Sequence, residues 1–272
     1  MPGYAIGDIH GCFYTLLALL EKIDFNPSVD KIYFIGDYID RGPFVYETLT
    51  FLCALKEKHH GMTFLIGNHE DMFLRAAYGN PFWKNVWLEN GGTSSINALI
   101  KNPSKFLSDS VKNSDIDFDE NFLKFIMSLK LFVETENHFL VHGNLCWHSP
   151  HILSNRHHIL WNREHVIIPD KIKNKPLVHG HTPLPLNHIL AQAPDSRVFC
   201  IDGGCVYYHQ FKEEGLGYLI ALRLDDNRIF AQKNVEPEIY PSTSIKRQTE
   251  KYLIDALEKY AGDLSSISIL KN

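Results

Sequence analysis

Three short stretches decide the fold of this chain: GDIHG at residues 7–11, GDYIDRG at 36–42 and GNHE at 67–70. Each directly follows a run of β-forming residues, at 3–6, 31–35 and 62–66. Carboxylate, imidazole and amide groups are therefore expected on loops at the carboxyl ends of successive strands, where open α/β sheets form ligand crevices. Asp, His and Asn together suit hard or borderline divalent metals, and they fit poorly with a cysteine-rich structural zinc site.

Composition places the chain among ordinary globular proteins and argues against some partners. Its 272 residues are 44% hydrophobic and 22% charged, which is enough to bury a substantial core. The net charge of −5 argues against broad binding of nucleic acid or of an anionic membrane. No signal peptide and no apolar run of about 18 residues is visible. The five cysteines form no C-x-x-C pair, which predicts reduced thiols and a cytoplasmic location: Cys12, Cys53, Cys146, Cys200 and Cys205.

The segments between the three motifs have helical periodicity. Apolar residues at helical spacing predict one helix over 12–23 and another from about Pro43. Proline suits a helix start because its missing N–H would be unpaired there anyway. The resulting β-α-β-α-β alternation predicts a largely parallel, buried first sheet.

Residues 71–134 interrupt this alternation. Helical runs at 72–78, 83–88 and 94–100 are separated by Asn-Pro and Gly-Gly breaks, which predicts a helical insertion beside the motif crevice. Within it, the acidic stretch 115–121 resembles a calcium loop but lacks the glycine and the final glutamate that such a loop needs. We therefore expect Asp117 or Asp119 to cap a helix.

The second half of the chain returns to strands. They are expected at 138–141, 176–178, 198–201 and 216–224, and the last should pair with 228–233 through a turn at 225–227. Residues 237–244 are predicted to be a linker. A short amphipathic helix should follow, with these apolar residues on one side: Tyr252, Leu253, Ala256, Leu257 and Tyr260.

Two further histidines follow predicted strands, His142 in VHGN and His181 in HGHT. The alternation of residues along the strand places His179 on the strand and His181 in the turn after it, so we take His181 as the candidate ligand. The collected donors are Asp8, His10, Asp37, Asn68, His142 and His181. They suffice for two metal ions that share one carboxylate, and two ions about 3.5–4 Å apart can clamp the in-line displacement of a phosphate ester. Asp40 is placed to orient a histidine, and Arg41 to grip phosphate oxygens.

The order of the motifs GDIHG, GDYIDRG, GNHE, HGN and GHT resembles the phosphoprotein phosphatase branch of the calcineurin-like metallophosphoesterases. It is similar to the bacterial and phage serine/threonine phosphatases and to the symmetrical diadenosine tetraphosphatases, and WLENGG at 87–92 favours the former. The resemblance implies an α/β (αββα) fold, a central β-sandwich flanked by helices. It implies a catalytic domain over 1–235 that contains the insertion 71–134, followed by a linker and short helical tail over 236–272.

The resemblance also implies roles for individual residues. The first metal would be held by Asp8, His10 and Asp37. The second would be held by Asp37, Asn68, His142 and His181. His69 would be the general acid, paired with Asp40, while Arg41 and Arg163 would bind the phosphoryl group. Asn144 departs from the family, which has Gly or Ala there, and we expect it to keep the turn by adopting left-handed backbone geometry.

The remaining histidines and the cysteines near the crevice receive no catalytic role. No base or orienting partner at a recognisable spacing accompanies Cys12 or Cys205, so thiolate catalysis is not expected. We interpret the other histidines as solvated loop residues: His59, His60, His148, His151, His157, His158, His165, His188 and His209.

The sequence therefore predicts a metal-dependent phosphatase acting on phosphorylated protein side chains, Ser/Thr and as a further option Tyr, by direct attack of a hydroxide that bridges two metals. Mn²⁺ is the expected ion, and Fe or Zn also fits these ligand types. A phosphorylated protein or peptide is the expected partner, with no nucleic acid and no membrane. The alternative is a symmetrical diadenosine tetraphosphate hydrolase. A third hypothesis, an inactive phosphopeptide-binding scaffold, is disfavoured by the intact ligand set and by His69.

Overall fold

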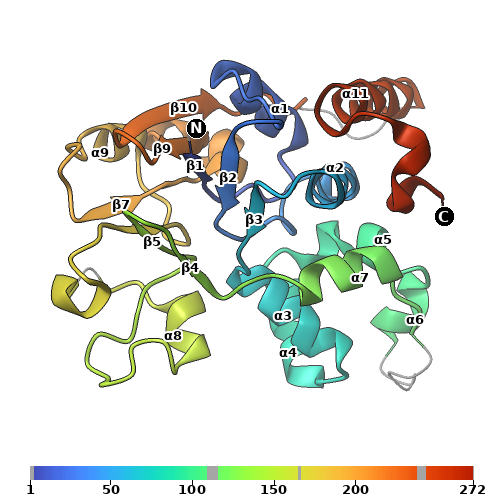
Figure 1. Ribbon diagram of the computed structural model, residues 1–272. Coiled ribbons are helices and arrows are strands. Elements are labelled where there is room, and N and C mark those ends of the chain that lie inside the picture. The colour runs from blue at the N-terminus through green and yellow to red at the C-terminus, as the bar shows by residue number, and fades with distance from the viewer. Residues whose placement is uncertain (1–2, 109–115, 165–166, 238–242, 272) are drawn as a thin grey trace.

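The first three motifs follow neighbouring parallel strands of a mixed sheet (Figure 1). The computed structural model describes residues 3–108, 116–164, 167–237 and 243–271. The strands of this sheet are β1 (Gly3–Ile6), β2 (Lys31–Phe34), β3 (Met62–Phe64), β8 (Asp202–Gly203), β9 (Tyr218–Arg223) and β10 (Arg228–Lys233). Their order is β10-β9-β1-β2-β3, with β8 also paired to β9.

The first sheet is less parallel than the sequence predicted. β1, β2 and β3 pair in parallel, but β9 runs antiparallel to β1, β8 and β10. The expected pairing of β9 with β10 across the turn at 225–227 is confirmed. A hairpin thus completes the sheet, because two strands joined by so short a turn must run antiparallel.

A second sheet lies against the first. Its strands, in order, are β4 (Phe132–Glu134), β5 (Phe139–Val141), β6 (Leu177–His179) and β7 (Val198–Cys200). β5, β6 and β7 pair in parallel, whereas β4 is antiparallel to β5. β4 was not predicted, since it falls in the segment 71–134 that we expected to be helical. Three residues are too few to show a strand period.

Alternating side chains divide the core into layers. Tyr4 and Ile6 of β1 face a large cluster formed with the helices, while Ala5 faces the second sheet in a separate cluster with Leu140 and Val178. A third cluster covers the outer face of β5 and β6. Two sheets packed between helical layers give the αββα architecture implied by the family resemblance, which is confirmed.

Helices cover both outer faces. They are α1 (Phe13–Lys22), α2 (Val45–Lys58), α3 (Asn68–Ala77), α4 (Pro81–Glu89), α5 (Ile96–Leu99), α6 (Pro103–Leu107), α7 (Glu120–Met127), α8 (Arg156–Trp161), α9 (Leu186–Leu190), α10 (Tyr208–Phe211) and α11 (Thr243–Ala261). Short 3₁₀ helices cover Gly92–Ser94, Pro169–Ile172, Cys205–Tyr207, Lys212–Glu214, Leu264–Ser266 and Ser268–Lys271. Among the described residues, no helix is both long and apolar enough to cross a membrane.

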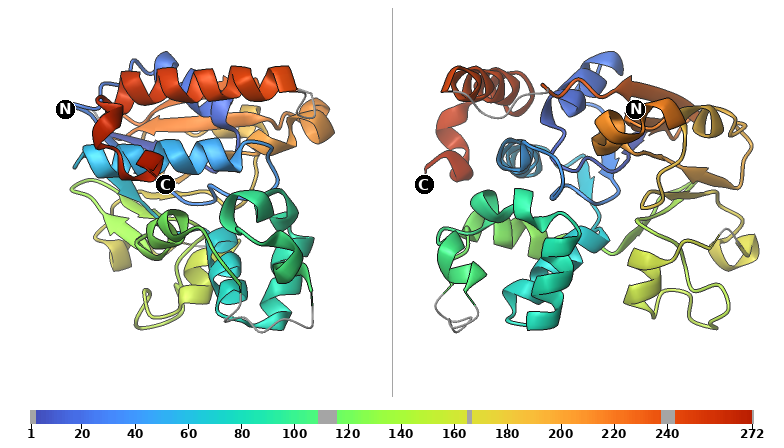
Figure 2. Two further views of the ribbon diagram at one scale, coloured as in Figure 1. Left: turned by 90° about the vertical axis from the view of Figure 1, so that its right-hand side faces the viewer. Right: turned by 180° about the vertical axis from the view of Figure 1, so that it is seen from behind.

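The C-terminal segment is more structured than predicted. α11 begins at Thr243, inside the expected linker, and packs along α2 (Figure 2). Leu253, Ala256, Leu257 and Tyr260 are buried as an apolar face should be, but Tyr252 is 44% exposed. The tail therefore contributes to the helical layer over the first sheet.

The segment 71–134 contains most of α3 and all of α4 to α7, and it ends in β4. The helix-capping interpretation of its acidic stretch is confirmed. The Asp119 carboxylate accepts hydrogen bonds from the backbone N–H groups of Asn121 and Phe122, both at 3.0 Å, at the start of α7. The part of the stretch at Asp115 lies outside the described residues.

Candidate metal centre and active site

The candidate metal ligands meet where strands of both sheets end. The six expected donors are all buried: Asp8, His10, Asp37, Asn68, His142 and His181. The loops that carry them turn sharply, and His10, Asp37 and His181 have left-handed φ angles of 47°, 55° and 67°. Such a conformation costs about 1–3 kcal/mol in a residue other than glycine. Backbone strain is therefore concentrated in the loops that bring these donors together.

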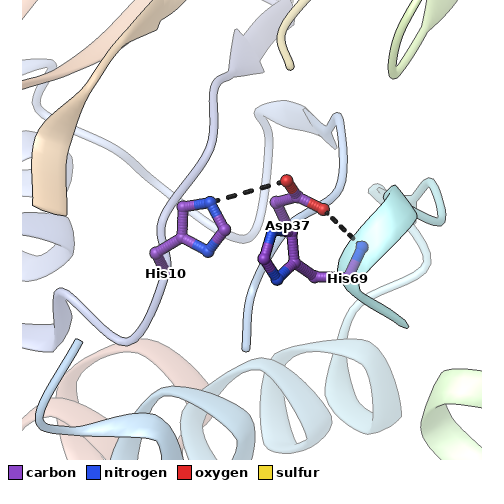
Figure 3. Close-up of side chains that lie close together, drawn as sticks. All are labelled: His10, Asp37 and His69. Carbon is purple, nitrogen blue, oxygen red and sulfur yellow. Dashed lines mark hydrogen bonds and ion pairs between the residues drawn. The ribbon is translucent and has the colours of Figure 1, made fainter. Parts of the chain in front are cut away.

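Asp37 lies at the centre of the group. Its Oδ2 is 3.5 Å from Nε2 of His10 and 3.4 Å from Nε2 of His142. Its Oδ1 accepts a hydrogen bond from the backbone N–H of His69 at 3.1 Å (Figure 3). Two sets of potential ligand atoms share Asp37, one with His10 and His69 and the other with His142 and His181. The first set contains His69, where we expected Asp8.

Backbone carbonyl groups orient the rings of His10 and His142. Nδ1 of His10 donates to the Ile39 carbonyl at 2.8 Å, and Nδ1 of His142 donates to the Ile35 carbonyl at 3.0 Å. We assign the tautomers from these carbonyl partners, which leaves the Nε2 lone pairs facing Asp37. Metal-binding histidines are commonly oriented in this way, through the nitrogen that does not bind the ion.

The second set holds several electron-rich atoms close together. Oδ1 of Asn68 lies 3.0 Å from Nε2 of His142 and 2.8 Å from Nδ1 of His181. Among the described residues, Oδ1 of Asp8 and Nε2 of His181 are buried without a hydrogen-bond partner. Buried polar atoms almost always have a partner. The donor set and the unpartnered atoms therefore fit a divalent cation.

Buried carboxyl groups beside the candidate ligands also favour a bound cation. Burial, and next the charges of Asp202 and Asp37, raise the pKa of Asp8 well above its usual value. Burial likewise raises the pKa of Asp202 to about 7. The His181 loop still approaches Asp8 closely, and its backbone N–H donates to Oδ2 at 3.1 Å. Only glycine allows this approach, because a Cβ on Gly180 would lie 2.1 Å from Oδ1 of Asp8.

His69 and Asp40 form a buried pair. Nδ1 of His69 lies 2.7 Å from Oδ2 of Asp40, and the side chains of Trp87 and Ser95 donate to the same carboxylate. Burial lowers the pKa of His69 to about 4. The contact with Asp40 fixes the ring, whose centroid lies 4.7 Å from that of the His10 ring.

The two arginines differ in their settings. Nη1 of Arg41 lies 2.8 Å from Nε2 of His10, inside the centre. Arg163 is exposed to solvent, yet its charge still affects the buried His181 of the centre. Burial, the neighbouring His142 and the charge of Arg163 together lower the pKa of His181 to about 2. Arg41 is thus part of the buried cluster, whereas Arg163 stands at its solvent edge.

The expectation for Asn144 was wrong, because its φ is not positive. Its side chain keeps the turn instead. Oδ1 accepts from the backbone N–H of Leu145 at 2.7 Å and from Nε1 of Trp147 at 2.8 Å. Nδ2 donates to the carbonyl of Glu164. Since Glu164 directly follows Arg163, Asn144 ties the Arg163 loop to the His142 motif.

Glu70 is a buried residue beside the site that the third motif contains and to which we gave no role from the sequence. Its carboxylate accepts four backbone N–H bonds, from Asp37 at 3.0 Å, Tyr38 at 2.8 Å, Ile39 at 3.2 Å and Gly67 at 2.9 Å. It thereby joins the second and third motif loops. A glutamate three residues after a helix N-cap is a recognisable capping signal, and it could have indicated part of this role.

Three other residues of the site were not predicted to act there: Trp87, Ser95 and Asp202. Asp202 follows the expected strand at 198–201, so its place at a strand end could have indicated a role in the site. Trp87 and Ser95 lie 47 and 55 residues from Asp40 in sequence. No local sequence pattern connects positions so far apart.

We expect Glu70→Gln to damage stability and activity together. The glutamine amide replaces a charged acceptor and places its own N–H groups against backbone N–H donors, which are left unpaired. We expect this to lower the free energy of unfolding by about 1.5–3 kcal/mol. Chemical denaturation and phosphatase assays would measure both effects. Glu258→Gln, at an exposed position on α11, is the matched control and should change neither. Full activity in Glu70→Gln would contradict the positioning role.

Comparisons with known proteins agree with this geometry. Residues 1–116 match the family model described as calcineurin-like phosphoesterase. The symmetrical bis(5'-nucleosyl)-tetraphosphatase of Pseudomonas putida is 42% identical over 80 residues, which cover 29% of this chain and 26% of that relative. The match thus spans about a quarter of the relative's length.

Solved structures extend the likeness in fold to most of the chain. A structure described as a putative diadenosine tetraphosphatase has a TM-score of 0.60 at 16% identity and covers 87% of this chain and 95% of its own. A protein serine/threonine phosphatase from Saccharomyces cerevisiae has a TM-score of 0.58 at 17% identity, covering 89% of this chain and 82% of its own. The family match over residues 1–116 includes the loops of the first three motifs, and this part of the chain is similar to the calcineurin-like phosphoesterases.

Proposed function

We propose that this protein is a metal-dependent phosphatase that hydrolyses phosphomonoesters on protein side chains. The observation that carries the proposal is the convergence of buried donors on Asp37, next to Arg41 and the His69–Asp40 pair. The proposed ligands of the two ions are Asp8, His10, Asp37, Asn68, His142 and His181. Two divalent ions, Mn²⁺ in our proposal and Fe or Zn as alternatives, would supply an activated water and neutralise phosphoryl charge. The five free thiols support a cytoplasmic location.

The protein's own residues divide the remaining work. Arg41 presents a planar guanidinium at the centre, where it can hold two phosphoryl oxygens at once, and Arg163 adds charge from the solvent edge. His69, oriented by Asp40, would give a proton to the leaving oxygen. An anionic substrate would favour the protonated ring.

The distribution of cations favours a single phosphate over a polyphosphate. A dinucleotide with four phosphates needs several basic groups in a row. Near α3, Arg75 and Arg156 are both engaged with the buried carboxylate of Asp71, at 2.7 and 2.8 Å. Arg41 and Arg163 therefore carry the local positive charge that we assign to substrate, which suits one phosphoryl group.

A second candidate, symmetrical diadenosine tetraphosphate hydrolysis, is favoured by a row of aromatic rings beside the centre. Trp161 lies edge-on to His181 with ring centroids 6.1 Å apart, and Trp83 lies 6.3 Å from Trp161. Phe82, which is 65% exposed, continues the row at 5.5 Å from Trp83. Such rings can stack a nucleobase. The Pseudomonas putida relative carries the corresponding name.

The two candidates are separated by comparing kcat/KM for phosphoserine peptides and for diadenosine tetraphosphate, with Mn²⁺ added and with a chelator as control. We expect the peptides to be the better substrates, and chelation to abolish turnover of both. A preference for the dinucleotide of about tenfold or more, or 1.4 kcal/mol of transition-state binding, would overturn the protein phosphatase assignment. Trp161→Leu should then weaken the dinucleotide reaction selectively.

A further inference from the structure

We propose that Glu89 selects substrates that carry a lysine or arginine close to the phosphorylated residue. The inference rests on the proposed protein phosphatase function. A cleft of about 420 Å³ opens beside Arg41, and its lining is formed by Arg41, Glu89, Asn90, Gly91, Val206, Tyr207 and Gln210. This volume lies in the range of pockets that bind small ligands. Because Arg41 belongs both to the cleft and to the metal centre, a peptide held at the centre can extend into this cleft.

Contacts of Arg41 connect the cleft to the proposed phosphoryl site. The backbone N–H of Arg41 donates to the Gly91 carbonyl at 3.1 Å, and the Arg41 guanidinium lies 5.3 Å from the centroid of the Tyr207 ring. Gly91 has a φ of 103°, and a Cβ there would lie 2.6 Å from Cγ of Arg41. Gly91 lies two residues after Glu89, the last residue of α4, so the turn that follows this helix is in direct contact with the residue that we assign to the phosphoryl group.

The cleft carries one positively and one negatively charged side chain. Its only charged lining residues within the described chain are Arg41, which is directed at His10, and Glu89. Glu89 is exposed and has no ion pair among the described residues. It also stands in the last turn of α4, where carbonyl groups already concentrate negative charge. A cationic side chain is the partner that both the carboxylate and the helix end would stabilise.

Stability of α4 does not account for a glutamate at position 89. An acidic side chain in the last turn opposes the helix dipole and is mildly destabilising. A substrate cation would reverse that effect when bound. Exposed ion pairs are weak, so we expect a preference of about three- to fivefold that declines as the salt concentration rises.

The test uses two phosphoserine peptides that differ only in a lysine or a glutamate beside the phosphoserine. For the wild-type chain, kcat/KM should be higher for the lysine peptide by about three- to fivefold at low salt. Glu89→Gln should bring the ratio close to one, and Glu89→Lys should invert it. Each variant's peptide rates are expressed relative to its own turnover of a small aryl phosphate, which corrects for loss of folded enzyme. Glu258→Gln, an equal charge change on α11 away from the cleft, should keep the wild-type ratio.

The possible failures are distinguishable. A wild-type ratio near one, or an unchanged ratio in both Glu89 variants, would overturn the role of Glu89 while leaving the phosphatase assignment intact. Hydrolysis of the dinucleotide with no turnover of either peptide would overturn the proposed function, and this inference with it.

Discussion

Asp37→Asn is expected to remove bound metal and activity together. Asp37 is 2% exposed, and its Oδ2 lies almost equally far from Nε2 of His10 and of His142, at 3.5 and 3.4 Å. A carboxylate in that position can serve both candidate ion sites. Its neutral amide keeps the shape but loses the charge. We expect kcat/KM to fall by about 10³-fold or more, since several kcal/mol of charge stabilisation depends on the ions.

Elemental analysis of purified protein, run beside the activity assay, measures this prediction. The wild-type chain should carry up to two ions after incubation with Mn²⁺, and Asp37→Asn clearly fewer. Asp255→Asn, an exposed aspartate on α11, is the matched control and should retain both metal and activity. Unchanged metal content in Asp37→Asn would show that the ions, if bound, do not depend on the proposed central ligand.

Thermal unfolding gives a readout of the same prediction that does not depend on turnover. Burial raises the pKa of Asp8 and of Asp37, and it raises that of Asp202 to about 7. A carboxyl with a raised folded-state pKa loses its contribution to stability as the pH rises from its unfolded value to its folded one. Because these carboxyls must lose their protons to bind an ion, Mn²⁺ should raise Tm more at about pH 8 than at about pH 5.5. Equal effects of Mn²⁺ at the two pH values would contradict the assignment of these carboxylates to the ions.

The metal centre could be predicted from sequence to the extent that it depends on strand ends. Parallel strands place their carboxyl ends at one edge of a sheet, so the motifs after β1, β2 and β3 were expected to lie together, as were those after β5 and β6. The side chains that follow them, from Asp8 to His181, are indeed buried together. Their proposed roles as ligands still depend on the metal measurements above.

Contacts between residues far apart in the sequence could not be predicted in this way. Glu70 holds the Asp37 loop from 33 residues away, and Trp87 and Ser95 hold Asp40 from still farther. Such partners are chosen by the tertiary fold, and no periodicity records them. Asn144 illustrates a different failure, because we assumed a backbone role for a residue whose side chain does the work. The short strand β4 and the early start of α11 were missed because packing against neighbouring elements overrides weak local signals.

His69→Asn separates two roles that the geometry leaves to His69, proton donor and metal ligand. Its Nδ1 is held by Asp40 at 2.7 Å, which suits a positioned acid, yet His69 also joins His10 and Asp37 in one set of potential ligand atoms. If His69 is the general acid, its replacement should lower turnover of phosphoserine peptides by about 10²–10⁴-fold. An aryl phosphate with a good leaving group needs less protonation and should lose much less, while metal content stays at the wild-type value.

The control for this prediction is His188→Asn, the same change at an exposed histidine on α9, which should alter neither rate nor metal content. Equal losses on both substrates, accompanied by a drop in bound Mn²⁺, would assign His69 to the metal instead of the leaving group. Equal losses with full metal content would point to a role in binding the phosphoryl group. The acid role requires unequal losses, because only a leaving oxygen of high pKa depends on the proton that His69 supplies.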